Sequence, residues 1–136
     1  MKYKKLSDDT YIFRLEVGED IVEEIESFCN DLDINAAEIK GIGALKEIEI
    51  KHYSVERQEY SAKEYHEELE ICSLYGLVTS IGLHAHIIVA NNKMNTFGGH
   101  LSKGVIGATC EGTIKILPGQ LDRKHDDQTG LKILDI

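Results

Sequence analysis

The sequence predicts an α+β domain in which a mostly antiparallel, strongly curved or barrel-like sheet of about seven strands packs on one main helix. Three observations lead to this prediction. Only residues 20–32 carry apolar side chains at helical spacing, whereas most of the later chain forms short alternating or apolar runs. Glycine and asparagine separate these runs, which is typical of hairpin connections. The length of 136 residues is that of one domain, so we expect a single domain over 1–136.

The first elements expected along the chain are a strand and the helix. In Tyr11–Val17 large apolar and polar residues alternate, as they do in a half-buried strand. Asp20 can then cap a helix, with Glu23 at the capping-box position three residues later. The apolar stripe that should face the core consists of Ile21, Val22, Ile25, Phe28, Cys29 and Leu32.

The rest of the chain predicts strands that follow one another mostly as hairpins. Residues 60–66 are polar and fit either an edge strand or a short turn of helix. Gly41–Leu45 is too short for a dinucleotide-binding loop and indicates a bend or a close backbone approach. The other expected strands are 36–42, 47–53, 69–75, 84–90, 97–101, 104–109, 112–117 and a short C-terminal one at 131–134.

Charge and hydropathy exclude several classes of protein. The 24 Asp and Glu outnumber the 15 Lys and Arg, and a net charge of −9 argues against direct contact with DNA phosphates. No apolar run is long enough to span a membrane, and Asp8 and Asp9 stand where a signal peptide needs an apolar stretch. We therefore expect a cytoplasmic protein.

Cys29, Cys72 and Cys110 form no CxxC pair and lie in apolar-periodic segments, so we expect them to be reduced and buried.

Three histidines are spaced as metal ligands. Side chains two apart on a strand point the same way, so His84 and His86 should share a face with their Cα atoms roughly 6.5–7 Å apart. His100 follows a turn and the pair Gly98–Gly99, which lacks the side chains that would block a close approach, and is the candidate third ligand. The alternative is that the HxH pair is simply solvated on a wet face of the sheet.

Three neutral imidazoles and an open fourth position are the usual ligands of a catalytic zinc, which acidifies bound water or polarises a carbonyl. We therefore expect a divalent metal, zinc, with room for a small-molecule ligand; imidazole also suits nickel, manganese and iron. Cys110 is the only cysteine that could be considered as a fourth ligand. Glu70 and Glu111, on predicted strands amid apolar neighbours, are candidates either for acid–base chemistry or for solvent-facing positions. Phosphate-loop, dinucleotide, nucleophile-elbow and HExxH motifs are absent.

Segments spread over nearly the whole chain resemble one known family. They are, in order, Gly41–Leu45, Leu69–Gly76, Leu83–His86, Gly98–Gly104, Ala108–Glu111, and Arg123 through Leu131. In this order they resemble the plants and prokaryotes conserved (PPC) domain, with the HxH and GGHL motifs as the most specific part. The resemblance implies a compact α+β unit whose sheet wraps one helix, a homotrimer, and a metal held by His84, His86 and His100. The wider fold group looks related to acetolactate decarboxylase, a zinc enzyme.

The chain differs from plant members of that family in two places. It has no Arg-Gly-Arg-Pro AT-hook, and residues 67–72 read Glu-Glu-Leu-Glu-Ile-Cys where plant members carry Gly-Arg-Phe-Glu-Ile-Leu. The resemblance thus implies a stand-alone prokaryotic type whose DNA-binding family label depends on an element missing here. Three functions stay open: a metal-binding assembly or regulatory module, a metal-dependent lyase or hydrolase acting on a small carboxylate or carbonyl substrate, and a nucleic-acid-associated regulator.

Overall fold

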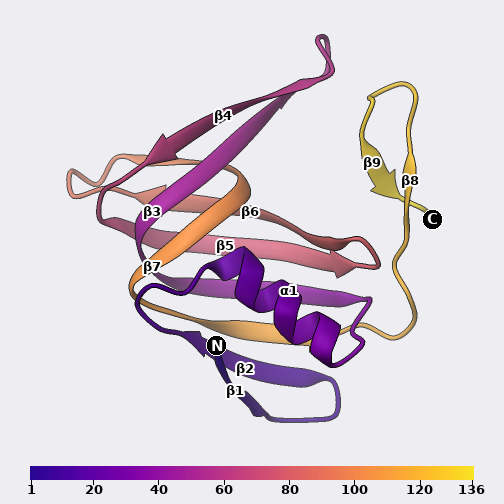
Figure 1. Ribbon diagram of the computed structural model, residues 1–136, viewed down its shortest axis with the longest axis horizontal. Helices are drawn as coiled ribbons and strands as arrows, with labels where there is room; N and C mark the ends of the chain where they lie inside the picture. The colour runs from indigo at the N-terminus through magenta and orange to yellow at the C-terminus, as the bar shows by residue number, and fades with distance from the viewer.

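A computed structural model describes all 136 residues and contains one helix and nine strands. Seven strands form one antiparallel sheet in the order β1-β2-β7-β6-β5-β3-β4, and β8 pairs with β9 alone. Figure 1 shows α1 lying across one side of the sheet, with β8 and β9 standing apart from it near the C-terminus. The elements are β1 (Lys2–Lys5), β2 (Thr10–Leu15), α1 (Ile21–Asp31), β3 (Ala37–Ser54), β4 (Glu59–Tyr65), β5 (Leu69–Thr79), β6 (Gly82–Ala90), β7 (Thr96–Ile116), β8 (Arg123–His125) and β9 (Lys132–Leu134).

The curvature of the sheet comes from its two longest strands. β3 pairs with β5 and with β7, while β6 pairs with β5 and with β7, so these four strands form a closed ring of pairings. Register shifts interrupt the β3–β7 pairing, and such bulges bend and twist a strand. The predicted α+β class, with a curved antiparallel sheet packed on a single helix, is confirmed.

Both long strands run through glycines at which the sequence prediction had interrupted them. A Cβ on Gly43 would lie 2.2 Å from the carbonyl oxygen of Thr109, and one on Gly112 would lie 2.1 Å from that of Lys40. These glycines are therefore positions of close strand-to-strand approach and not strand ends. The expected strands 36–42 and 47–53 are parts of β3, and the expected strands 97–101, 104–109 and 112–117 are parts of β7.

Two short strands carry no apolar periodicity and were not predicted. β1 consists of four exposed residues and forms by pairing with β2, and β8 forms by pairing with β9. The ambiguous segment 60–66 is strand β4, and the expected C-terminal strand is β9.

Asp20 both caps the helix and attaches it to the sheet. Its Oδ1 accepts hydrogen bonds from the N–H groups of Val22 at 2.9 Å and Glu23 at 3.1 Å, which satisfies free donors of the first turn. Its Oδ2 accepts from the N–H of Gly104 in β7 at 2.8 Å. One buried carboxylate therefore sets both the start of α1 and its position against β7.

The predicted apolar stripe of the helix is largely confirmed. Leu32 is the exception: it is 42% exposed because it lies at the C-cap, after the last helical turn. Val22 packs against the core while partly buried. The buried members are Ile21, Ile25, Phe28 and Cys29, which belong to a core of 22 residues.

We expect Asp20→Ala to lower the free energy of unfolding by about 3 kcal/mol. The change removes a helix cap, worth about 1 kcal/mol, and leaves the buried N–H of Gly104 without a partner, at about 1–3 kcal/mol. Urea unfolding followed by circular dichroism measures the difference. Asp8→Ala, at a fully exposed carboxylate, is the matched control and should change stability by less than about 0.5 kcal/mol.

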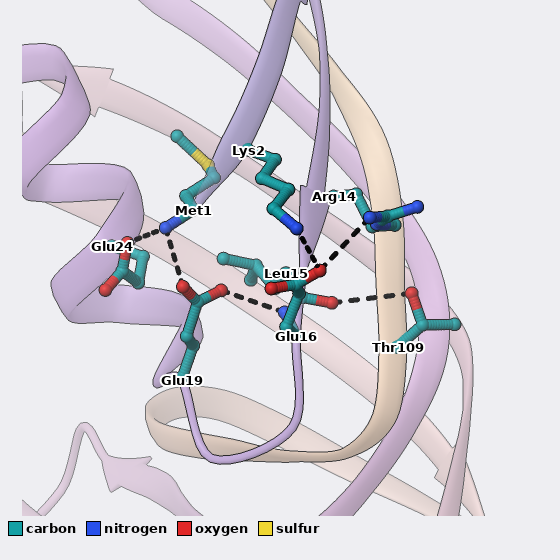
Figure 2. A network of polar contacts seen from close by, with 8 residues as sticks. All are labelled: Met1, Lys2, Arg14, Leu15, Glu16, Glu19, Glu24 and Thr109. Carbon is teal, nitrogen blue, oxygen red and sulfur yellow. Dashed lines mark hydrogen bonds and ion pairs between the residues drawn. The ribbon is translucent and has the colours of Figure 1, made fainter.

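A polar network joins the first strand to the start of the helix (Figure 2). The α-amino group of Met1 contacts carboxylate oxygens of Glu19, at 2.8 Å, and of Glu24. The second oxygen of Glu19 accepts from the N–H of Glu16 at 2.8 Å, and the Glu16 carboxylate in turn pairs with Lys2. These contacts hold β1 beside the first turn of α1.

Two of the three cysteines are buried as predicted, and one is not. Cys29 and Cys110 lie in the core, whereas Cys72 is exposed. The pairing of β5 with β6 shifts register between Ile71 and Ser73, so that both Cys72 and Ser73 face solvent.

The structure has no helix with the length and apolar character needed to cross a lipid bilayer.

Only Cys72 should react quickly with a thiol reagent in the folded protein. Burial raises the pKa of Cys29 to about 11 and that of Cys110 to about 12, so at about pH 8 the reactive thiolate is rare at both. We expect one thiol per chain to be titrated under native conditions and three after unfolding. Cys72→Ser should abolish the fast phase; a native count of two or three would contradict the burial described here.

Candidate metal centre

The three predicted histidines lie side by side on the two adjacent strands β6 and β7. Alternation along β6 buries Ala85 and Ile87, which puts His84 and His86 on the opposite, outer face. In the antiparallel pairing of β6 with β7, His100 is the direct partner of His86. The local period of two and a single register thus bring all three imidazoles to one face.

The rings are close enough to act on one ligand. Their centroids are 5.3 Å apart for His84 and His86, 5.3 Å for His84 and His100, and 5.7 Å for His86 and His100. One nitrogen from each ring can be chosen so that all three lie within 4.8 Å of one another. Ligands about 2.0–2.1 Å from a tetrahedral zinc are roughly 3.4 Å apart, so the rings need to close by at most about 1.4 Å.

The glycine pair before His100 has the role predicted for it. A Cβ on Gly98 would lie 2.1 Å from the carbonyl oxygen of Ile87 in β6, and one on Gly99 would lie 2.9 Å from that of Lys51 in β3. Only glycine lets β7 pass this close to both neighbours, and His100 is held beside the pair of histidines as a result.

The electrostatics favour the neutral form of His84 and His100, which is the form that binds a metal. Loss of hydration, with a contribution from the neighbouring Arg123, lowers the pKa of His84 to about 4. Burial and the nearby His86 lower the pKa of His100 as well. The Nδ1 of His100 is buried and has no hydrogen-bond partner. Coordination of a cation is one way to satisfy such a nitrogen, so the three residues fit a divalent metal ion.

The triad opens onto a cavity of about 790 Å³ whose far wall is the C-terminal hairpin β8–β9. Arg123 of β8 reaches the triad: its Nη2 lies 2.9 Å from Nδ1 of His84, and its Nη1 donates to the carbonyl oxygen of Lys132 at 2.9 Å. Arg123 stands in a polar stretch without apolar periodicity, so nothing in the sequence predicts a role for it at the triad. Only the packing of the hairpin brings it to the site.

The other candidate residues lie elsewhere. Cys110 is fully buried in the core and does not line the cavity, so it is not placed as a fourth ligand. Glu70 and Glu111 are exposed on β5 and β7 and line other depressions of the surface, so the solvent-facing alternative is the right one for both. No Asp or Glu lines the cavity at the triad.

The chain is similar to solved structures over almost its whole length. A protein from Bacteroides thetaiotaomicron described as a "putative DNA binding protein" is 28% identical, with a TM-score of 0.94 over 98% of this chain and 96% of that one. The metal-containing protein from Archaeoglobus fulgidus is 32% identical, with a TM-score of 0.86 over 100% and 99% of the two chains. Alpha-acetolactate decarboxylase from Bacillus subtilis strain 168 is 16% identical, with a TM-score of 0.58 over 92% of this chain and 60% of that one, which shows a common fold alone.

Sequence comparison gives the family. The bifunctional protein GlmU of Synechococcus sp. (strain JA-3-3Ab) is 30% identical over 129 residues, 93% of this chain and 20% of that protein. The chain therefore spans about a fifth of the length of the curated relatives it matches. The family model described as the Plants and Prokaryotes Conserved (PCC) domain matches residues 3–118, which include all three histidines of the triad. Since that match takes in most of the chain, this chain belongs to the plants and prokaryotes conserved domain family, abbreviated PCC or PPC.

Proposed function

We propose that this PPC-type chain binds one divalent metal ion, zinc, through His84, His86 and His100. The observation that carries the proposal is the grouping of three imidazoles with ligand atoms within 4.8 Å of one another. The similarity to a metal-containing protein from Archaeoglobus fulgidus supports it. When bound, such an ion supplies a Lewis acid and an open coordination position. The chain's own part is to hold three imidazole nitrogens close together on the paired strands β6 and β7.

Metal analysis of protein purified without chelators or an affinity metal tests this proposal. We expect about one divalent ion per chain, with zinc preferred when zinc, nickel and manganese are offered together to the metal-free protein. Less than about a tenth of an ion per chain after incubation with excess zinc would refute the metal centre.

We propose further that the chain acts as a cytoplasmic homotrimer without direct contact to DNA. The resemblance to the family is the support for the trimer. Sedimentation velocity should give the mass of three chains, and a monomer at micromolar concentration would overturn it. The cytoplasm suits three unpaired cysteines.

No mobility shift is expected for duplex DNA at low salt and micromolar protein. A net charge of −9 opposes the approach of the chain to DNA phosphates, and the sequence contains no Arg-Gly-Arg-Pro AT-hook. A shift that disappears as salt is raised would instead support a direct DNA contact.

A second candidate function, a metal-dependent lyase or hydrolase, is favoured by one observation. The triad faces a cavity of about 790 Å³, large enough for a small carboxylate or carbonyl substrate. Because no carboxylate side chain lines this cavity, proton transfer would depend on its histidines, tyrosines or bound water. Proton NMR of 2-hydroxy and 2-oxo carboxylates incubated with zinc-loaded protein tests the candidate. Consumption no faster than with a triad variant would eliminate it for these substrates.

A further inference from the structure

The cavity at the triad has a charge opposite to that of the molecule as a whole. The chain carries 24 acidic and 15 basic residues, yet the cavity is lined by three of the basic ones and by no acidic one. Its cations are Lys51, Arg123 and Lys132. A hollow with walls of a single sign concentrates ligands of the opposite sign.

Two cations of this wall, Arg123 and Lys132, have no carboxylate partner, and of the two only Arg123 is half-buried. The other two arginines are paired: Arg14 lies 3.1 Å from Glu16, and Arg57 lies 2.7 Å from Glu59. Lys51 is also paired, at 3.2 Å from Glu49. Arg123 contacts only an imidazole nitrogen and a backbone carbonyl oxygen. The residue is half-buried, and an anion in the cavity would give its guanidinium a counter-charge and acceptors for its remaining N–H donors.

Binding of an ion at the triad increases the need for such an anion. A guanidinium is always a donor, so the Nδ1 of His84 accepts the hydrogen bond from Arg123 with the single lone pair of the neutral ring. If an ion takes Nδ1, it replaces Arg123. If it takes Nε2, the proton moves to Nδ1, which then cannot accept. In either case His84 cannot serve a metal ion and Arg123 together, and an Nη2 donor becomes free to face the cavity.

The segment that carries Arg123 is anchored as a wall of the cavity. The hydroxyl of Tyr53 in β3 donates to the carbonyl oxygen of Thr129 at 2.6 Å, and Asp126 accepts from both the N–H and the hydroxyl of Thr129 in the hairpin turn. In Figure 1 the β8–β9 hairpin is the yellow pair of strands outside the seven-stranded sheet. It lies beyond residues 3–118, the part matched by the family model.

We propose that the cavity binds a small organic anion and that Arg123 is the residue that recognises its oxyanion, a carboxylate or a phosphate, beside the histidine triad. The proposal rests on the proposed metal centre for the coupling between ion and anion, but the unpaired charge of Arg123 does not depend on it. The fork of N–H donors in a guanidinium matches two oxygens of either anion, which a lysine cannot do. The ligand class is thus set by a residue of the β8–β9 hairpin.

Calorimetric titration of acetate and of inorganic phosphate, in separate experiments, tests the proposal and distinguishes the two oxyanions. We expect the zinc-loaded protein to bind at least one of the two anions. Arg123→Gln should lower the affinity for that anion at least about tenfold, and the affinity of Arg123→Lys should lie between those of the wild type and Arg123→Gln. Arg57→Gln removes the same charge from an exposed ion pair and should leave the affinity unchanged. Linkage between two ligands is reciprocal. The factor by which zinc raises the anion affinity of the wild type should therefore equal the factor by which the anion raises its zinc affinity. In Arg123→Gln we expect no such coupling.

The outcomes separate this proposal from the metal centre. Equal affinity of wild type and Arg123→Gln, or no binding of either anion, overturns the role of Arg123 even if one zinc binds per chain. Arg123-dependent anion binding without zinc binding refutes the metal centre and leaves this proposal standing. If Arg123→Gln disrupts the folding of the β8–β9 hairpin, NMR of the wild-type protein tests the role of Arg123 instead. The anion should shift the side-chain N–H signal of Arg123 and not that of Arg57.

Discussion

Replacing His84 and His86 together with alanine is expected to abolish binding of the proposed divalent ion while leaving the fold intact. The change deletes two of the three imidazoles and leaves His100 alone, which cannot hold an ion against water and buffer. Both residues are on the outer face of β6, so the core loses no packing and the free energy of unfolding of the metal-free protein should change by less than about 1 kcal/mol. Metal content by mass spectrometry and urea unfolding measure the two effects.

The matched control for this double variant is His125→Ala. His125 is exposed in β8, pairs with Asp127 at 3.4 Å and does not line the cavity, so its loss should leave about one ion per chain. A double variant that retains the metal content of the wild type would place the ion elsewhere. Loss of the ion from His125→Ala as well would point to a general effect of removing histidines and not to loss of the ligands.

Gly112→Ala is expected to give the largest loss of stability of any single methyl addition considered. The added Cβ would lie 2.1 Å from the carbonyl oxygen of Lys40 and 2.5 Å from the ring of Phe13. Neither neighbour can withdraw, because Lys40 belongs to β3 in the closed ring of strands and Phe13 is fully buried. We expect the free energy of unfolding to fall by about 4 kcal/mol or more, or the protein to be recovered only as aggregate.

Gly41→Ala provides the control, because Gly41 is the direct partner of Gly112 in the β3–β7 pairing. Its added Cβ would meet the carbonyl oxygen of Glu111 at 3.3 Å, a contact that a small shift relieves, so we expect a cost of about 1 kcal/mol. Urea unfolding of the two variants beside the wild type measures the difference. Similar losses for both would mean that the strands separate easily at Gly112.

The histidine triad could be predicted from sequence because its geometry is nearly local. A period of two puts His84 and His86 on one face whatever the sheet around them, and the strand carrying His100 follows directly after one turn. Prediction was poorer where glycine occurred. The prediction divided β3 and β7 at their glycines, whereas Gly43 and Gly112 mark close contacts between strands distant in sequence. The sequence predicts a buried Cys72, because the pattern of apolar residues in 69–75 does not reveal the single-residue bulge in β5 that turns this side chain to solvent.

The sequence alone determined the fold class, the single capped helix and the shared face of the histidine pair, since each depends on propensities and periods within a few consecutive residues. Tertiary structure decided which strands join into a ring, and it placed Arg123 against His84, 39 positions earlier in the chain. The physical reason is that strand register and hairpin docking arise from contacts between distant segments. A polar residue such as Arg123 has no periodicity that reports where such a contact will form.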